Sequence, residues 1–321
     1  MLAHLPLGSG REFDRIRAIV EALGPAAEGI GDDCAVLPVG GVTLAVSTDV
    51  SVEGVHFRRD WLSMEEVGFR ATASALSDLA AMGADAAGVL VALVLPRASA
   101  NGDVTAVMRG AADAAVQAGT CIVGGDLSSG PAWSVGVTVL GTCGRAVMRA
   151  GARAGDGVWV SGALGGARAA LTALERGTDP GDARAAFARP PLRLALGRWL
   201  ARHGATAMLD LSDGLAGDAR HLAAASAVRL DLDLDRLPLG PGVAQAAALA
   251  GMAPARFAAL GGEDYELLVT FPTAFGDADA ARCIAETGVP LARIGTVQAG
   301  QGVQLLLGGQ PLQLPGFDHF A

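Results

Sequence analysis

Apolar residues recur at helical spacing in three stretches of the first half of the chain, residues 11–24, 62–82 and 101–118. Each stretch predicts a helix, because positions three and four apart share one helix face. Ser63, followed by two glutamates, is typical of a helix N-terminus. Apolar runs of strand length lie between the helices, at residues 42–50, 86–95, 121–123 and 133–143. These elements do not repeat as regular β-α-β units.

The second half of the chain alternates shorter predicted strands and helices. The strands are predicted at residues 158–161, 206–211, 228–234 and 265–271, with two more before residue 307. Helices are predicted after Gly162–Gly166, at 192–203, 214–225 and 279–287, and in the alanine-rich run Ala244–Ala250. A composition shift near residue 145 predicts two domains, residues 1–145 and 146–321, in a protein of the α+β or α/β class.

Composition excludes several classes of protein. Apolar residues make up 51% of the 321 residues and charged residues 18%, which indicates a globular chain, and the net charge of −9 argues against a nucleic-acid partner. All 24 basic residues are arginine, which excludes a P-loop lysine, a protein-kinase lysine and a Schiff-base lysine. The chain has no signal-peptide pattern, no membrane-length apolar run and four scattered cysteines, so we expect a soluble, cytoplasmic protein with no membrane partner.

Carboxylates occur singly or in pairs inside short segments rich in glycine and hydroxyl groups. The six segments are Gly31–Cys34, Ser47–Asp49, Leu76–Leu79, Gly124–Asp126, Asp210–Gly214 and Gly261–Asp264. Each adjoins an apolar stretch, so each is expected at the end of a buried element. Mg²⁺ is typically held by carboxylates together with substrate phosphates. Segments of one chemical type, this far apart in the chain, predict a single convergent site for metal ions and phosphate.

Most of these segments also have simpler structural interpretations. They are a turn at Gly31–Cys34 or Ser47–Asp49, a hairpin at Gly124–Asp126, helix capping by Ser212 or Asp213, and a surface loop at Glu263. Asp78 differs because it lies in an apolar helical run, where a buried carboxylate needs a partner, and we favour a metal ion over an arginine. At Gly162–Gly166 a tight turn is favoured over a phosphate-binding helix N-terminus.

As a set, the segments resemble those of thiamine-monophosphate kinases, which belong to the superfamily of aminoimidazole ribonucleotide synthetase and selenophosphate synthetase. The motifs occur in family order across residues 11 to 320. They are Gly29-Ile30-Gly31-Asp32-Asp33-Cys34-Ala35, Ser47-Thr48-Asp49, Val55-His56-Phe57, Leu76-Ser77-Asp78-Leu79-Ala80-Ala81-Met82-Gly83-Ala84, Gly124-Gly125-Asp126, Asp210-Leu211-Ser212-Asp213-Gly214-Leu215, Gly261-Gly262-Glu263-Asp264-Tyr265-Glu266-Leu267 and Gly316-Phe317-Asp318-His319-Phe320.

The resemblance implies ATP-dependent phosphorylation of thiamine monophosphate to thiamine diphosphate, the last step of thiamine diphosphate biosynthesis. It implies a homodimer whose N-terminal domains close a β-barrel together, with an α/β domain behind. Several Mg²⁺ ions are then expected at Asp33, Ser47, Thr48, Asp49, Asp78, Asp126, Asp210 and Asp213. ATP contacts are expected from Gly125, Asp126, Arg149 and Ser212, and contacts to thiamine monophosphate from His56, Glu263 and Phe317.

Two positions depart from the family's pattern. Ala75 stands where an asparagine commonly precedes Leu-Ser-Asp, and Met108 aligns with an aromatic residue near the nucleotide. One alternative is a superfamily member with another acceptor. The missing cysteine before Cys34 and the ending at Ala321 argue against the selenophosphate synthetases and the carbamoyl-dehydrating relatives. The other alternative is a module that holds structural Ca²⁺, against which the absence of an EF-hand loop argues.

Overall fold

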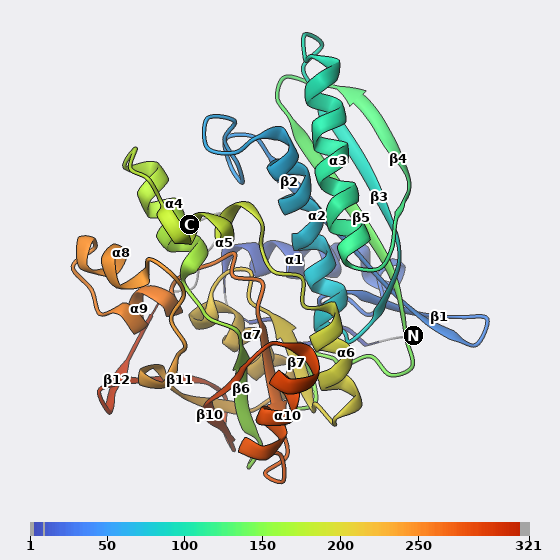
Figure 1. The fold of residues 1–321 in the computed structure, drawn as a ribbon. Helices are drawn as coiled ribbons and strands as arrows, with labels where there is room; N and C mark the ends of the chain where they lie inside the picture. The colour runs from blue at the N-terminus through green and yellow to red at the C-terminus, as the bar shows by residue number, and fades with distance from the viewer. Residues whose placement is uncertain (1–2, 9, 315–321) are drawn as a thin grey trace.

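The computed structural model describes residues 3–8 and 10–314, and the strands of its first half form one five-stranded sheet. The strand order is β1-β2-β5-β3-β4, and all neighbours are antiparallel except β3 and β4. The bounds are Ala35–Val39 (β1), Val42–Val52 (β2), Asp85–Leu95 (β3), Ile122–Ser129 (β4) and Ser134–Cys143 (β5). Helices α2 (Met64–Ala81) and α3 (Asn101–Gln117) pack together over one face of this sheet (Figure 1).

Helix α2 is the buried centre of the molecule. It begins with the predicted cap: Ser63 Oγ accepts the N–H of Glu66, and the Glu66 carboxylate accepts the N–H of Ser63. Glycines let its neighbours approach closely, because a Cβ added to Gly68 would lie 1.9 Å from the carbonyl oxygen of Val107 in α3. A Cβ on Gly197 in α6 (Leu194–Arg202) would lie 2.0 Å from that of Ala80. These contacts fix the position of α2, and therefore of Asp78 near its end.

The second half of the chain builds a mixed seven-stranded sheet in the order β12-β11-β8-β10-β6-β9-β7. Its strands are Gly157–Ser161 (β6), Ala207–Asp210 (β7), Arg229–Asp233 (β8), Leu267–Phe271 (β9), Leu291–Gln298 (β10), Gly302–Leu307 (β11) and Gln310–Leu312 (β12). The further helices are Gly166–Glu175 (α4), Arg184–Ala188 (α5), Leu215–Ser226 (α7), Val243–Leu249 (α8), Pro254–Ala259 (α9) and Asp277–Thr287 (α10). Helix α2 also packs against β7 and α6, so one hydrophobic core connects both halves.

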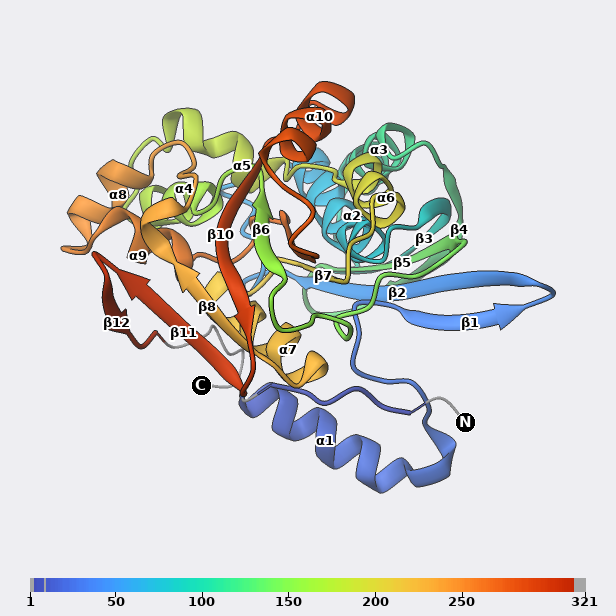
Figure 2. The ribbon, with the colours of Figure 1, turned by 90° about the horizontal axis from the view of Figure 1, so that it is seen from below.

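Helix α1 (Arg11–Leu23) lies along the outside of the molecule, and none of its residues is buried. Figure 2 shows it below the rest of the chain, with the hairpin of β1 and β2 projecting to one side. No helix among the described residues has both the length and the apolar composition to cross a bilayer.

Most predicted elements are confirmed, including the alanine-rich helix α8, but one prediction was wrong in a way that matters. The strand predicted at residues 121–123 continues to Ser129, so Gly124–Asp126 lies inside β4 and forms neither a turn nor a hairpin. The short elements β1, α5, α9 and β12 were not predicted. They lack a full period of the apolar pattern, so tertiary contacts determine them.

Candidate active site

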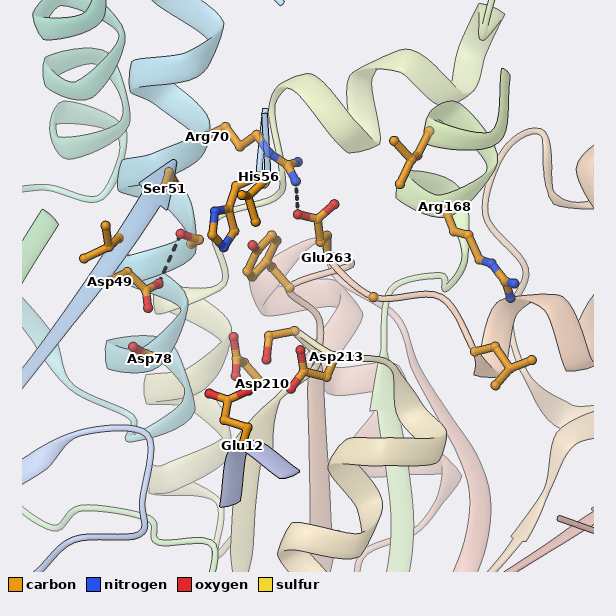
Figure 3. A pocket seen from close by; sticks show the side chains of 18 residues that line it. Glu12, Asp49, Ser51, His56, Arg70, Asp78, Arg168, Asp210, Asp213 and Glu263 are labelled. Carbon is orange, nitrogen blue, oxygen red and sulfur yellow. Dashed lines mark hydrogen bonds and ion pairs between the residues drawn. The ribbon is translucent and has the colours of Figure 1, made fainter. Parts of the chain in front are cut away.

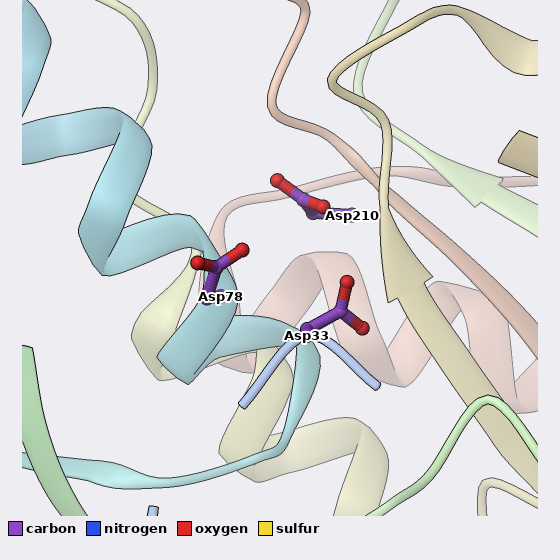
Figure 4. Close-up of side chains that lie close together, drawn as sticks. All are labelled: Asp33, Asp78 and Asp210. Carbon is purple, nitrogen blue, oxygen red and sulfur yellow. The ribbon is translucent and has the colours of Figure 1, made fainter. Parts of the chain in front are cut away.

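Three carboxylates from distant segments meet at the junction of the two halves (Figure 4). Asp33 comes from the loop before β1, Asp78 from the last turn of α2, and Asp210 from the end of β7. Each offers one oxygen, and these oxygens all lie within 4.8 Å of one another. The second oxygen of Asp33 is buried without a hydrogen-bond partner among the described residues. Such a group of oxygen ligands fits a divalent cation.

Burial and repulsion from neighbouring carboxylates disfavour the charged forms of Asp78 and Asp210. Burial is the largest cause for Asp210, whose pKa is raised to about 8, and the neighbouring Asp33 adds to the shift. Burial also raises the pKa of Asp78 well above its usual range, followed by the charges of Asp49 and Asp210. A bound cation would reverse this effect, because it stabilises the ionised carboxylates.

Arg149 supplies the protein's own positive charge to this cluster. Its Nη2 donates to Oδ1 of Asp33 at 2.5 Å, and its backbone N–H donates to Oδ2 of Asp32 at 3.0 Å. Burial alone would lower the pKa of the guanidinium, but Asp33 and Asp32 raise it above its usual range. Burial and the charge of Asp33 raise the pKa of Asp32 to about 7. Arg149, expected to contact the nucleotide, therefore lies beside the carboxylate cluster.

A cavity of about 530 Å³ opens beside Asp78 and Asp210 (Figure 3). One end is acidic, and there Asp49 and Asp213 join the two clustered carboxylates. Its lining also includes Tyr265, and His56, Arg70 and Glu263 lie at the other end. The cavity thus combines an end suited to cations and phosphates with an end suited to an organic group.

The Ser47–Asp49 segment divides between the two faces of the first sheet. Ser47 Oγ donates to Oδ2 of Asp78 at 2.5 Å, and Asp49 accepts from Ser74 Oγ at 3.1 Å, so both side chains face α2. Thr48 points to the opposite face, where its hydroxyl lies 3.0 Å from that of Thr138. The structure therefore does not bring the Thr48 side chain to the cavity. Alternation along a strand was the signal that could have predicted this.

Asp126 and Gly125 also lie outside the cavity, on the exposed edge strand β4. The register pairs Val50 with Gly136, Gly136 with Ala92, and Ala92 with Asp126. Directly paired residues point to the same face, so Asp126 shares the uncovered face with Thr48 and Val50. Within one protomer, Asp126 is therefore separated from the carboxylate cluster by the sheet.

The Asp210–Gly214 segment connects β7 to α7. The alternative interpretation, in which Ser212 or Asp213 caps this helix, is wrong, because the N-cap is Gly214 and no side chain caps it. Instead the buried Asp218 accepts the N–H groups of Asp213 and Gly214, at 3.1 and 3.0 Å. Ser212 and Asp213 both line the cavity. Sequence reasoning missed Asp218, which holds this loop from inside the helix.

The glycine-rich segment Gly162–Gly166 before α4 forms a turn. The backbone N–H of Gly165 in this turn already donates to a carboxylate of the protein. Both oxygens of Asp264 accept the N–H of Gly165, at 2.8 and 3.0 Å. Gly165 has a φ of 85°, in the left-handed region that favours glycine. The interpretation of Gly162–Gly166 as a tight turn is therefore confirmed, with a protein carboxylate at this helix N-terminus.

The two predicted substrate contacts that the structure describes both line the cavity, while Phe317 lies outside the described residues. His56 Nδ1 accepts the N–H of Val52 at 3.1 Å, so a neutral ring carries its proton on Nε2. Glu263 forms an ion pair with Arg70, a residue that sequence reasoning missed. Arg70, Ser74 and Asp78 are spaced four apart along α2, and this polar stripe on an apolar helix was the available signal.

Comparison with known proteins agrees with this fold. The family described as AIR synthase related protein matches with its N-terminal domain at residues 31–143 and its C-terminal domain at residues 153–308. The fold and the convergent carboxylates define the chain as a two-domain protein of this class. At 20% identity, a structure of the hydrogenase maturation protein HypE in complex with ATP shares the fold, with a TM-score of 0.73 over 97% of this chain and 96% of that one.

Closer relatives identify the particular family. The thiamine-monophosphate kinase of Escherichia coli K12 is 36% identical, covering 97% of this chain and 96% of that protein. The thiamine-monophosphate kinase of Mycobacterium tuberculosis H37Rv is 39% identical, covering 76% of this chain and 74% of that protein. A solved structure described as AaThiL complexed with AMPPCP and TMP has a TM-score of 0.87, with 32% identity and 97% coverage of both chains. The chain belongs to the thiamine-monophosphate kinase family.

Proposed function

We infer that this protein transfers the γ-phosphoryl group of ATP to thiamine monophosphate and releases thiamine diphosphate. The observation that carries this function is the convergence of Asp33, Asp78 and Asp210 beside a cavity whose other end is lined by His56, Arg70 and Glu263. The relative solved with AMPPCP and TMP, which aligns over 97% of both chains, supports both substrates.

Charge neutralisation is the main chemical task of such a site. The acceptor is a phosphate monoester with a second pKa of about 6, so its attacking oxygen is largely ionised at neutral pH and needs little help from a general base. Bound Mg²⁺ would neutralise the phosphates of both substrates. Asp33, Asp78 and Asp210, with Asp49, Asp213 and the hydroxyl of Ser47, are the described groups that fit it.

The protein's own residues then align the two substrates. Arg149, held by Asp32 and Asp33, offers positive charge to the nucleotide phosphates, and Ser212 adds a hydroxyl from the loop before α7. His56 and Glu263 receive the organic part of the acceptor at the other end of the cavity. No side chain is required to carry the phosphoryl group, so we propose direct in-line transfer.

We propose that the protein acts as a homodimer, in which Asp126 serves the site of the partner subunit. The face of the first sheet opposite α2 carries exposed apolar side chains, including Val50, and the edge strand β4 exposes Val123 and Leu127. A second copy meeting these surfaces would bury them and close a barrel from two sheets. It would also give a binding role to Gly125 and Asp126, which one protomer alone leaves outside the cavity.

The division into residues 1–145 and 146–321 stays a proposal, supported by the two sheets, which lie on either side of that boundary. The cytoplasmic location, the stacking role of Phe317 and the effects of Ala75 and Met108 on nucleotide binding stay predictions from the sequence.

Turnover tests the function directly. Purified protein is incubated with Mg·ATP and thiamine monophosphate, and thiamine diphosphate is followed by chromatography, with unphosphorylated thiamine as the control acceptor. Product from the monophosphate alone supports the proposal. ATP binding without product from either acceptor would contradict the assignment of His56 and Glu263 to this acceptor.

A further inference from the structure

Arg70 is a buried cation in the wall of the cavity, on the second turn of α2. Its guanidinium lies over the ring of Phe187, with Cζ 4.1 Å from the ring centroid, and Nη1 donates to the carbonyl oxygen of Phe187. Nη2 forms the ion pair with Glu263 that Figure 3 draws as a dashed line. Stacking and hydrogen bonding on one phenylalanine leave the guanidinium little rotational freedom. Arg70 is therefore a fixed charge, and Glu263 is its ionic partner.

Glu263 lies in a segment whose backbone is held in an unfavourable conformation. Glu263 has a φ of 66° and Tyr265 a φ of 50°, both in the left-handed region that is unfavourable for residues other than glycine. The Glu263 N–H donates to the carbonyl oxygen of Ser212 at 2.7 Å, and the Tyr265 N–H to that of Leu211 at 2.9 Å. The segment is thus tied to the loop that carries Ser212 and Asp213.

The residues after Glu263 are also fixed by buried contacts. Asp264 accepts the N–H of Gly165, and Glu266 pairs with Arg193, whose Nε donates at 2.7 Å. Of the three acidic residues Glu263, Asp264 and Glu266, only Glu263 lines the cavity. Backbone strain that persists at two cavity-lining residues, Glu263 and Tyr265, points to a functional role for this segment.

Exposure distinguishes the roles of the two partners. The Arg70 side chain is 5% exposed and that of Glu263 28%, so the carboxylate is the group presented to the cavity. Thiamine carries a quaternary thiazolium cation and an aminopyrimidine, and a fixed carboxylate can pair with the first or accept a hydrogen bond from the second. An unpaired glutamate in this place would change rotamer more easily.

We propose that Arg70 is a positioning residue that holds the Glu263 carboxylate as a fixed anion for the heteroaromatic part of the acceptor. The inference rests on the proposed function and adds to it the residue that sets acceptor affinity. Arg70 acts on this acceptor through Glu263 and not through the acceptor's phosphate.

The test compares two ligands that differ only in the phosphate. The KM for thiamine monophosphate and the inhibition constant for unphosphorylated thiamine are measured for the unchanged protein, Arg70→Met, Glu263→Gln and the double variant. We expect Arg70→Met to raise both constants by about 10- to 100-fold, the worth of a charge-assisted hydrogen bond, while the KM for ATP stays within about twofold. The double variant should lose no more affinity for the two ligands than Glu263→Gln alone.

Arg189→Met is the matched control. Arg189 also stacks on a phenylalanine, with Cζ 3.8 Å from the ring centroid of Phe69, and it pairs with Asp113, but it does not line the cavity. Its removal should leave both acceptor constants unchanged. If Arg70→Met fails to fold, Arg70→Lys keeps the charge without the planar fork and carries the same test.

Three results would overturn the proposal. An effect on thiamine monophosphate alone would mean that Arg70 contacts the phosphate. If the fold-change of the acceptor constants in the double variant equals the product of the two single fold-changes, Arg70 and Glu263 act independently. A lower melting temperature with unchanged acceptor constants would make Arg70 a structural residue. If the unchanged protein binds ATP but does not turn over thiamine monophosphate, the proposed function itself fails, and this inference fails with it.

Discussion

The guanidinium of Arg149 and the carboxylate of Asp33 are bonded at 2.5 Å across a separation of 116 residues. The Asp33 side chain is fully buried and that of Arg149 is 17% exposed, so little solvent screens the pair. The contact links the loop before β1 to the segment between the two sheets, at the cluster where we propose Mg²⁺ binds. Fold stability and metal binding therefore depend on the same carboxylate.

Replacement of Arg149 by methionine should destabilise the metal-free protein. Removing one partner of a buried pair leaves the other charge uncompensated, at a cost of about 3–5 kcal/mol in the free energy of unfolding. Mg²⁺ should recover part of the loss, because it replaces the missing positive charge beside Asp33. Urea unfolding with EDTA and with Mg²⁺ measures both effects. Arg58→Met, which breaks the exposed pair with Asp60, serves as control and should change little. Equal losses in the free energy of unfolding of Arg149→Met and Arg58→Met would contradict the prediction.

Asp78→Asn should keep the fold and lose most of the turnover. Asparagine is a neutral and poorer Mg²⁺ ligand, and it also relieves the repulsion that raises the pKa of Asp78. We expect kcat to fall by about 100-fold or more, since even partners of metal ligands cost about 10–100-fold. The melting temperature in EDTA should stay the same or rise. Turnover within a few fold of the unchanged protein would remove Asp78 from the metal site.

The stability of the metal-free protein should fall as the pH rises from about 4 to about 8, between the unfolded and folded pKa values of two buried carboxylates. The pKa of Asp32 is raised from 3.8 to about 7 and that of Asp210 from 3.8 to about 8, so the folded state binds these protons more tightly than the unfolded state. Their contribution is fully present below the unfolded pKa values and is lost as the pH passes the folded ones.

Mg²⁺ should stabilise the protein more at high pH than at low pH, because protons compete with the metal for the same carboxylates. Melting temperatures at pH 6 and pH 8.5, in EDTA and in Mg²⁺, measure this. Asp210→Asn should flatten the metal-free pH profile. A melting temperature in EDTA that rises steadily over this range would refute the assigned shifts.

Leu127→Arg should disrupt the proposed dimer. Leu127 is 64% exposed on the edge strand β4, so the substitution introduces no buried charge within one protomer. In the homodimer it would place a charge at the interface, and sedimentation should then detect monomers with little turnover. Ile284→Arg, at a 46% exposed position of α10 away from the first sheet, should leave the assembly unchanged. If the protein without substitutions sediments as a monomer and has full turnover, a site shared between two copies is ruled out.

Transfer from ATP made chiral at the γ-phosphorus should invert its configuration. A single in-line displacement inverts once, whereas a phosphoenzyme intermediate would invert twice and give net retention. Stereochemical analysis of the thiamine diphosphate product decides between them.

The sequence by itself determined the chemistry of the site and most of the elements that carry it. Carboxylates in glycine-rich segments beside apolar runs identified Asp33, Asp78 and Asp210, because local pattern predicts both the element and its end. The absence of lysine excluded the phosphate-binding sites of P-loop proteins and protein kinases, which use a lysine. Capping at Ser63 was likewise predictable, since it depends on residues within one turn.

Only the tertiary structure decided which polar groups share a face. Ser47 and Thr48 are neighbours in the chain, yet α2 covers the face of one and leaves the other open. The pairing of Arg70 with Glu263 joins residues 193 positions apart, and no local pattern encodes such a contact. Burial, charge pairing and sheet coverage arise from long-range packing, so the sequence predicted the carboxylates that meet at this site but not the contacts that hold them.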